Sequence, residues 1–163
     1  MSGFAISEAQ SKKLHSALHD LSVQAEAKSV FMSDRGGNII AQTSQDQDGT
    51  IDNVAALAAG SFCATRELAR MIGEPEFHSI FHQGERANIY IQSTVFDILI
   101  LVLFGKETTP GLVKLYTEKT CLELGTLLEE VMKQNAADAS SQPVTFKIAE
   151  NAQPFAVKKG DTP

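Results

Sequence analysis

Residues 104–107, Phe104-Gly105-Lys106-Glu107, are the first candidate for a functional motif, because they combine residue types that can bind phosphate. A glycine followed by a lysine, between a strand and a helix, is how P-loops bind the phosphates of a nucleotide. That motif also needs a glycine five positions before Gly105, where this chain has Ile100, and a Ser or Thr in place of Glu107. The sequence therefore does not favour direct nucleotide binding.

Two histidine pairs have spacings that could bring their rings together. His15 and His19 lie one turn apart on a predicted helix, which is metal-ligand spacing, but no third ligand accompanies them. His78 and His82 point to the same side of a predicted strand. We interpret both pairs as partly exposed surface residues and expect no metal site. For the strand pair, a role in pH response or in an edge-to-edge contact stays open.

Catalysis by a nucleophile or by an acid-base pair has no recognisable motif in this sequence. There is no Gly-x-Ser-x-Gly elbow, and neither Cys63 nor Cys121 lies in a catalytic signature. Both cysteines lie in predicted helices and are interpreted as reduced core thiols. Glu123, Glu129 and Glu130 lie on the polar face of an amphipathic helix. The sequence thus predicts a protein that is not an enzyme and holds neither a metal nor a cofactor.

Charge and hydropathy limit the classes of partner. The formal net charge is −6 and the basic residues are scattered, so the basic field that nucleic acids and anionic membranes attract is missing. The N-terminus lacks a basic and apolar signal segment. The strongest apolar run, residues 95–104, contains Asp97 and is too short for a membrane span. We expect a cytoplasmic protein without a nucleic-acid or membrane partner.

The elements that position these residues follow from hydrophobic periodicity and turn signals. They predict the order αββαβββα, which is typical of an α+β domain with a five-stranded antiparallel sheet and helices on both faces. The first predicted helix spans residues 7–27, the second runs from a cap at 52 or 53 to residue 71 or 72, and the third spans 110–134. The predicted strands span residues 29–33, 38–43, 77–82, 87–93 and 95–104.

The chain has the length of a single domain. We assign residues 1–134 to one layered domain. From residue 135 the composition changes to Ala, Ser, Gln, Asp and Pro, which predicts a flexible C-terminal tail over residues 135–163. Phe146, Ile148, Phe155 and Val157 are the apolar residues of this tail that could add a second contact to a partner.

The second predicted helix carries two stripes of residues at helical spacing. The stripe of Val54, Leu57, Ser61, Ala64, Leu68 and Met71 is expected to pack in the core. A second stripe of small and mostly uncharged residues is expected to face away from the sheet, where charged side chains are usual. A contiguous surface of this kind indicates a contact with another protein. This second stripe consists of Ala56, Ala59, Cys63, Arg66 and Arg70, with Ala55, Gly60 and Phe62 beside it.

With these elements in order, the chain resembles the roadblock (dynein light chain) family, and within it the MglB-like bacterial polarity and gliding-motility proteins. The resemblance covers nearly everything from the first helix to Gln134. It rests on the element order and on six segments at matching separations. These are Val30–Asp34 with Gly37–Ile40, Leu57–Gly60, Leu68–Phe77, Phe81–Gly84 and Gly111–Val113.

The resemblance implies a homodimer whose sheets join edge to edge and whose second helices lie side by side as a platform. MglB-like proteins use this platform to bind MglA, a Ras-like GTPase, and to stimulate its GTP hydrolysis, with a location concentrated at a cell pole. Some family members have small residues where this chain has Arg66 and Glu67. A charged residue at Ala59 is expected to block docking without unfolding the dimer. The candidate partner-binding residues are Ala56, Ala59, Phe62, Cys63, Arg66, Glu67 and Arg70.

Three alternatives stay open at this point. Arg66 or Arg70 could act as an arginine finger, although the resemblance implies an activator that repositions the catalytic residues of the GTPase, so docking is their first expected role. The protein could be a roadblock scaffold that tethers a GTPase without accelerating hydrolysis. It could also be a small-ligand sensor, which would need a cavity lined by convergent polar groups.

Overall fold

Apolar residues at helical spacing alternate along the chain with short runs rich in β-branched and aromatic residues, and they form the predicted order αββαβββα. The computed structural model describes residues 5–44 and 49–141. The helices are α1 (Glu8–Gln24), α2 (Thr50–Ile72) and α3 (Pro110–Ser141), and the strands are β1 (Ser29–Ser33), β2 (Ile39–Gln42), β3 (Ser79–His82), β4 (Asn88–Ser93) and β5 (Leu99–Phe104).

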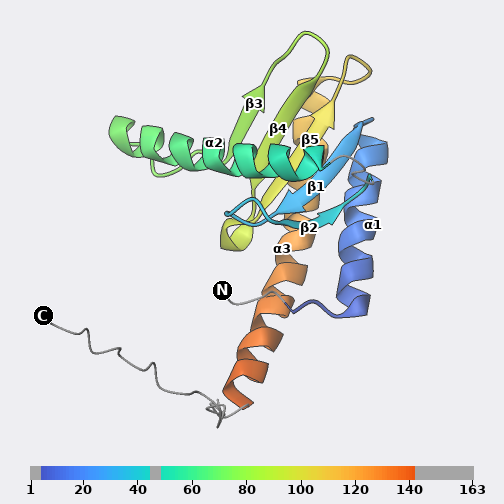
Figure 1. Ribbon diagram of the computed structural model, residues 1–163, viewed down its shortest axis with the longest axis vertical. Helices are drawn as coiled ribbons and strands as arrows, with labels where there is room; N and C mark the ends of the chain where they lie inside the picture. The colour runs from blue at the N-terminus through green and yellow to red at the C-terminus, as the bar shows by residue number, and fades with distance from the viewer. Residues whose placement is uncertain (1–4, 45–48, 142–163) are drawn as a thin grey trace, which may run out of the picture.

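The five strands form one antiparallel sheet in the order β2-β1-β5-β4-β3. Helix α2 crosses one face of this sheet, and α1 and α3 lie on the other face (Figure 1). The predicted α+β layered fold, with helices on both faces of a five-stranded sheet, is therefore confirmed. The strand order leaves β2 and β3 at the two edges.

Helix α1 begins where its capping residues predict. The Ser7 hydroxyl accepts a hydrogen bond from the Gln10 amide at 3.2 Å, and the Gln10 side chain accepts one from the Ser7 amide at 2.9 Å. The helix ends at Gln24 and not at the predicted Ala27. It ends there because Glu26 adopts a left-handed φ of 50° that turns the chain towards β1.

Strand β5 is shorter than predicted. Residues 95–98 were expected to be extended, but Val95–Asp97 form a short turn, labelled η1, between β4 and β5. Within it Phe96 and Asp97 have left-handed φ values of 59° and 58°. Hydrophobic composition alone cannot distinguish such a turn from a strand.

Helix α2 starts earlier than predicted and ends as predicted. Its N-cap is Gly49, so the expected caps Asp52 and Asn53 lie inside its first turn. Its C-cap is Gly73 with a φ of 78°, a conformation that glycine adopts without a steric cost.

Helix α3 follows Thr109, whose hydroxyl accepts a hydrogen bond from the Leu112 amide at 3.3 Å. It continues past the predicted end at Gln134 to Ser141, so residues 135–141 of the predicted tail are helical. The rest of the predicted tail, with its four apolar residues, lies outside the described residues. Of the helices in the described ranges, none combines the length and the apolar character that a membrane span requires.

A hydrophobic cluster fills each side of the sheet. On one side, leucines of α1 and α3 pack over Val30, Met32 and Ile100. On the other side, α2 packs over Phe31 and Leu101. The second cluster positions α2, and with it every candidate partner-binding residue.

Candidate protein-docking surface

The face of α2 that contacts the sheet is made largely of alanines. They pack over the large side chains Phe31, Ile91, Leu99 and Leu101, and their small volume lets the helix axis lie close to the sheet. The buried residues of this face are Ala55, Ala58, Ala59, Phe62 and Ala69.

Two candidate partner-binding residues therefore lie in the core. Ala59 is 2% exposed and Phe62 is 4% exposed, and both belong to the cluster between α2 and the sheet. The prediction that they face away from the sheet was wrong. The sheet supplies the bulk on this side, so the complementary helix face is the one with small residues.

The stripe that was expected to fill the core is largely exposed instead. Leu57 is 75%, Leu68 is 55% and Met71 is 82% exposed, and the neighbouring Ile72 is 68% exposed. We call Leu57, Leu68, Met71 and Ile72 the apolar stripe. Hydrophobic periodicity shows that such residues share a face, but it cannot show which of two faces the sheet covers.

The apolar stripe begins beside a groove of about 390 Å³ between α2 and the β3–β4 side of the sheet. Its lining is mostly apolar and includes Leu57, Ile89 and His82. The groove therefore lies on the side of α2 that faces the β3 edge.

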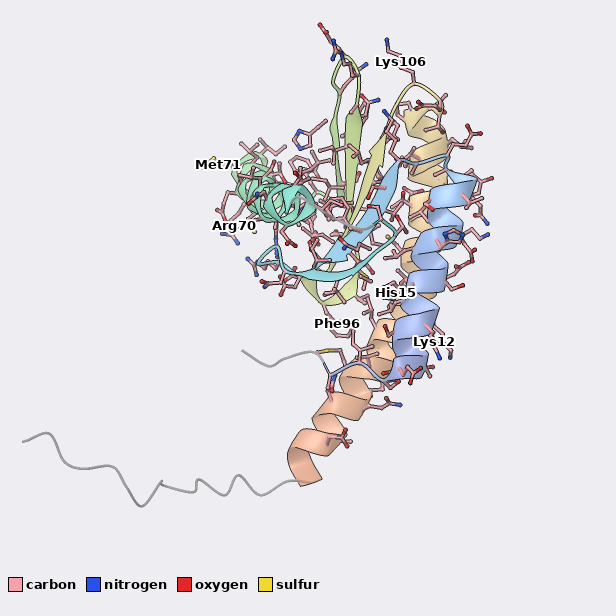
Figure 2. The ribbon with its side chains drawn as sticks, turned by 45° about the vertical axis from the view of Figure 1, so that its right-hand side comes forward. Lys12, His15, Arg70, Met71, Phe96 and Lys106 are labelled. Carbon is pink, nitrogen blue, oxygen red and sulfur yellow. The ribbon has the colours of Figure 1, made fainter. Side chains whose placement is uncertain are left out.

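A third set of residues on α2 forms an exposed stripe at spacings of four and three. Ala56, Gly60, Glu67 and Arg70 are exposed and Cys63 is half-buried. We call these five residues the docking stripe. Figure 2 shows Arg70 and Met71 on different sides of the helix. Glu67 and Met71 lie one turn apart, so the docking stripe and the apolar stripe are adjacent parts of the exposed face of α2. Four of the candidate partner-binding residues, Ala56, Cys63, Glu67 and Arg70, thus lie together on the surface.

Arg66, the remaining candidate, lies between the docking stripe and the sheet. Its guanidinium contacts the Asp97 carboxylate at 2.9 Å, and its side chain is one-third exposed. Arg70 contacts the Glu67 carboxylate at 3.1 Å on the surface. Both arginines of the candidate set are therefore paired with carboxylates of the same chain.

Arg35, from the β1–β2 hairpin, contacts the same carboxylate as Arg66. Its guanidinium lies 3.4 Å from Asp97. A side-chain hydrogen bond with Cys63 and the nearby Asp97 carboxylate raise the pKa of Arg35 above its usual value. Arg35 and Asp97 thus belong to the surface beside Cys63. Sequence analysis missed both, because nothing in their local sequence signals a contact with α2.

Gly37 allows the hairpin to approach α2 closely. It has a φ of 84°, and a Cβ at this position would lie 2.5 Å from the Ala56 Cα atom. Only glycine combines that backbone conformation with that approach. The close packing sets the hairpin against the helix at Ala56.

The histidine pairs lie apart from the docking stripe. His82 lines the groove beside β3, and His78 precedes that edge strand. His15 contacts the Ser11 carbonyl oxygen at 2.8 Å on the surface of α1.

Comparisons with known proteins place this fold. Residues 16–104 match the Roadblock/LC7 domain. No curated protein sequence matches the chain. The structure of Myxococcus xanthus MglB is similar at 33% sequence identity and a TM-score of 0.68, over 72% of this chain and 96% of that one.

Two further solved structures agree with this match. The gliding protein MglB from Thermus thermophilus has 26% identity and a TM-score of 0.72, over 77% of this chain and 96% of that one. A structure described as MglB with a tetrameric arrangement has 25% identity and a TM-score of 0.72, over 78% and 96%. The chain therefore belongs to the Roadblock/LC7 family, with MglB proteins among its structural relatives.

Proposed function

We propose that this protein is a homodimeric docking platform that binds a Ras-like GTPase of the MglA type and stimulates its GTP hydrolysis. The reaction takes place in the partner, and the present chain is a regulator in the cytoplasm, concentrated at a cell pole. The observation that carries the proposal is the docking stripe along α2, whose N-terminal half consists of small, exposed residues.

The docking stripe suits protein recognition because small side chains let another backbone or helix approach closely. Ala56 and Gly60 form its N-terminal half, and Cys63, Glu67 and Arg70 add polar contacts towards the C-terminus. The family resemblance implies that the equivalent residues of MglB-like proteins belong to the platform formed by the two second helices. Such a surface with few charges at its centre is typical of protein interfaces.

The apolar stripe and the β3 edge support a homodimer. Four large apolar side chains more than half exposed are an unusual cost for an isolated protomer. They lie on the side of α2 towards β3, whose outer edge can pair with the same edge of a second copy. One of the similar structures is itself described as tetrameric, which supports self-association in this group.

The arginine pairings support activation without an arginine finger. A finger must reach the phosphates of the partner's nucleotide, whereas Arg66 is paired with Asp97 and Arg70 with Glu67. We infer that both arginines help to dock the GTPase and that the activator repositions the GTPase's own catalytic residues. The same pairings are compatible with the scaffold alternative, in which the GTPase is tethered without faster hydrolysis.

The ligand-sensor alternative receives less support. The groove beside β3 offers His82 and Ser61 as its polar side chains, and the rest of its lining is aliphatic. A specific metabolite site needs several polar groups that converge on the ligand.

Multiple-turnover GTP hydrolysis by the GTPase, with and without this protein, tests the proposal. We expect faster hydrolysis with the wild-type protein and none of this stimulation with Glu67→Arg, which places an opposite charge in the docking stripe. Leu115→Arg is the matched control, because Leu115 is an exposed residue of α3 on the other side of the sheet. Binding without stimulation by the wild-type protein would favour the scaffold, and stimulation by Glu67→Arg would contradict the assigned surface.

A further inference from the structure

The turn between β4 and β5 has an unusual backbone. Phe96 has φ 59° and ψ 30°, and Asp97 follows with φ 58°. Left-handed conformations are costly for residues with a Cβ, most of all for bulky ones, and such turns usually contain Gly, Asn or Asp. Asp97 suits this position, whereas Phe96 does not.

Packing of the Phe96 side chain in the core does not offset this backbone strain. It is 47% exposed and belongs to neither hydrophobic cluster. The adjacent Val95 is also partly exposed. Strain that packing does not explain, at an exposed aromatic residue, points to a function for the side chain.

Hydrogen bonds and ion pairs connect the turn with the rest of the molecule. The Thr94 amide donates to the Ile98 carbonyl at 2.8 Å, which closes the turn. Asp97 then contacts Arg66 of α2 at 2.9 Å and Arg35 of the hairpin at 3.4 Å. These ion pairs connect the turn with the residues beside Cys63, so Phe96 has a defined position relative to the docking stripe.

The turn also lies on the same side of α2 as Arg70, a residue of the docking stripe. In Figure 2, Met71 lies at the upper side of the helix, Arg70 at its lower side, and Phe96 further below. Arg66, which borders the docking stripe, contacts Asp97 of the turn, so a partner seated on the docking stripe approaches the turn.

We propose that Phe96 is an anchor residue of the docking surface, which inserts into an apolar pocket of the partner that binds the docking stripe. The inference rests on the proposed function and extends the surface from α2 to the β4–β5 turn. Aromatic residues are enriched at interfaces, and anchors in desolvated pockets contribute most of the binding energy when the surrounding contacts exclude water. Arg35 and Asp97 supply such contacts here. The complementary partner surface therefore has an apolar pocket with charged groups at its rim.

The variant Phe96→Gly separates binding from folding. Glycine adopts the left-handed conformation without strain, so the melting temperature should stay unchanged or rise. We expect the affinity for the GTPase, loaded with a non-hydrolysable GTP analogue, to fall by roughly tenfold or more. Isothermal titration calorimetry measures this affinity. Phe96→Tyr, which retains the ring, should bind within about threefold of the wild-type protein.

The controls distinguish the two levels of the proposal. Leu115→Ala removes another exposed apolar side chain, on α3, and should leave the affinity unchanged. If Glu67→Arg abolishes binding and Phe96→Gly binds like the wild type, the anchor is wrong and the docking stripe stands. If the wild-type protein does not bind the GTPase, the proposed function fails and the anchor with it. A change in molecular mass of Phe96→Gly by light scattering would assign the turn to self-association and overturn the inference.

Discussion

Ala59→Arg tests directly which face of α2 contacts the sheet. If Ala59 were part of the partner-binding surface, an arginine there would block docking and leave the fold intact. In the structure Ala59 is 2% exposed and packs in the cluster that contains Phe31, Phe62 and Leu101. The substitution should therefore unfold the protein or weaken it severely.

The magnitude follows from two costs. A large side chain in a well-packed core forces its neighbours apart, which costs about 1–3 kcal/mol. A buried charge without a partner adds several kcal/mol more. We therefore expect the free energy of unfolding to fall by at least about 4 kcal/mol, a large part of the roughly 5–15 kcal/mol that stabilises a typical domain.

Urea unfolding, followed by circular dichroism at one fixed protein concentration, measures this loss. With a slope of about 2 kcal/mol per molar urea, the midpoint should fall by roughly 2 M. Glu67→Arg is the matched comparison, since it places the same side chain on the exposed face. It replaces a surface ion pair with Arg70 by two like charges on the exposed face and should cost about 1 kcal/mol or less.

One result would refute this reasoning. If Ala59→Arg unfolds at the wild-type urea midpoint and yet fails to stimulate the GTPase, Ala59 belongs to the docking surface. The packing of α2 described above would then be incorrect.

Three further predictions follow from the structure. Gly37→Ala should lower the free energy of unfolding by about 2–3 kcal/mol, because the added Cβ meets α2. Gly73→Ala, with open space around the added Cβ, should lower it by only about 1 kcal/mol. Equal urea midpoints for the two variants would count against the close approach of the hairpin to α2. Met71→Glu should leave the protomer folded, since Met71 is exposed, but should halve the mass of the proposed dimer by light scattering; a mass that stays dimeric would remove the apolar stripe from that interface. Burial, and secondarily Glu118, raises the pKa of the Cys121 thiol to about 12 from 9.0, so the folded state retains a proton that the unfolded state loses. The free energy of unfolding should therefore fall as the pH rises from about 9 towards 12. Iodoacetamide at pH 8 should label Cys121 more slowly in the folded than in the urea-unfolded protein, as mass spectrometry would show.

The local signals of the sequence determined most of the fold. Ser7 with Gln10, Gly73, and Thr109 with Pro110 mark helix ends through hydrogen bonds and backbone preferences that act within a few residues. The element order and the family resemblance also follow from patterns of this kind. The helix ends that were predicted wrongly are the end of α1, the start of α2 and the end of α3.

The candidate site depended on contacts between distant segments. Nothing near Arg35 or Asp97 in the sequence shows that Asp97 contacts Arg66, because the three residues meet only when the hairpin, α2 and the β4–β5 turn are assembled. The left-handed backbone of Phe96 is likewise visible only in the three-dimensional structure.

The sequence by itself determined that α2 carries one stripe of small residues and one of large apolar residues, since helical spacing alone places them. Which of these faces the sheet was decided by the tertiary structure. Phe31, Ile91 and Leu101 fill much of the space above the sheet, so the helix face that packs on them consists mostly of alanines such as Ala55 and Ala59, with Phe62 beside them. Leu57, Leu68 and Met71 remain outside, where a second copy of the chain can cover them.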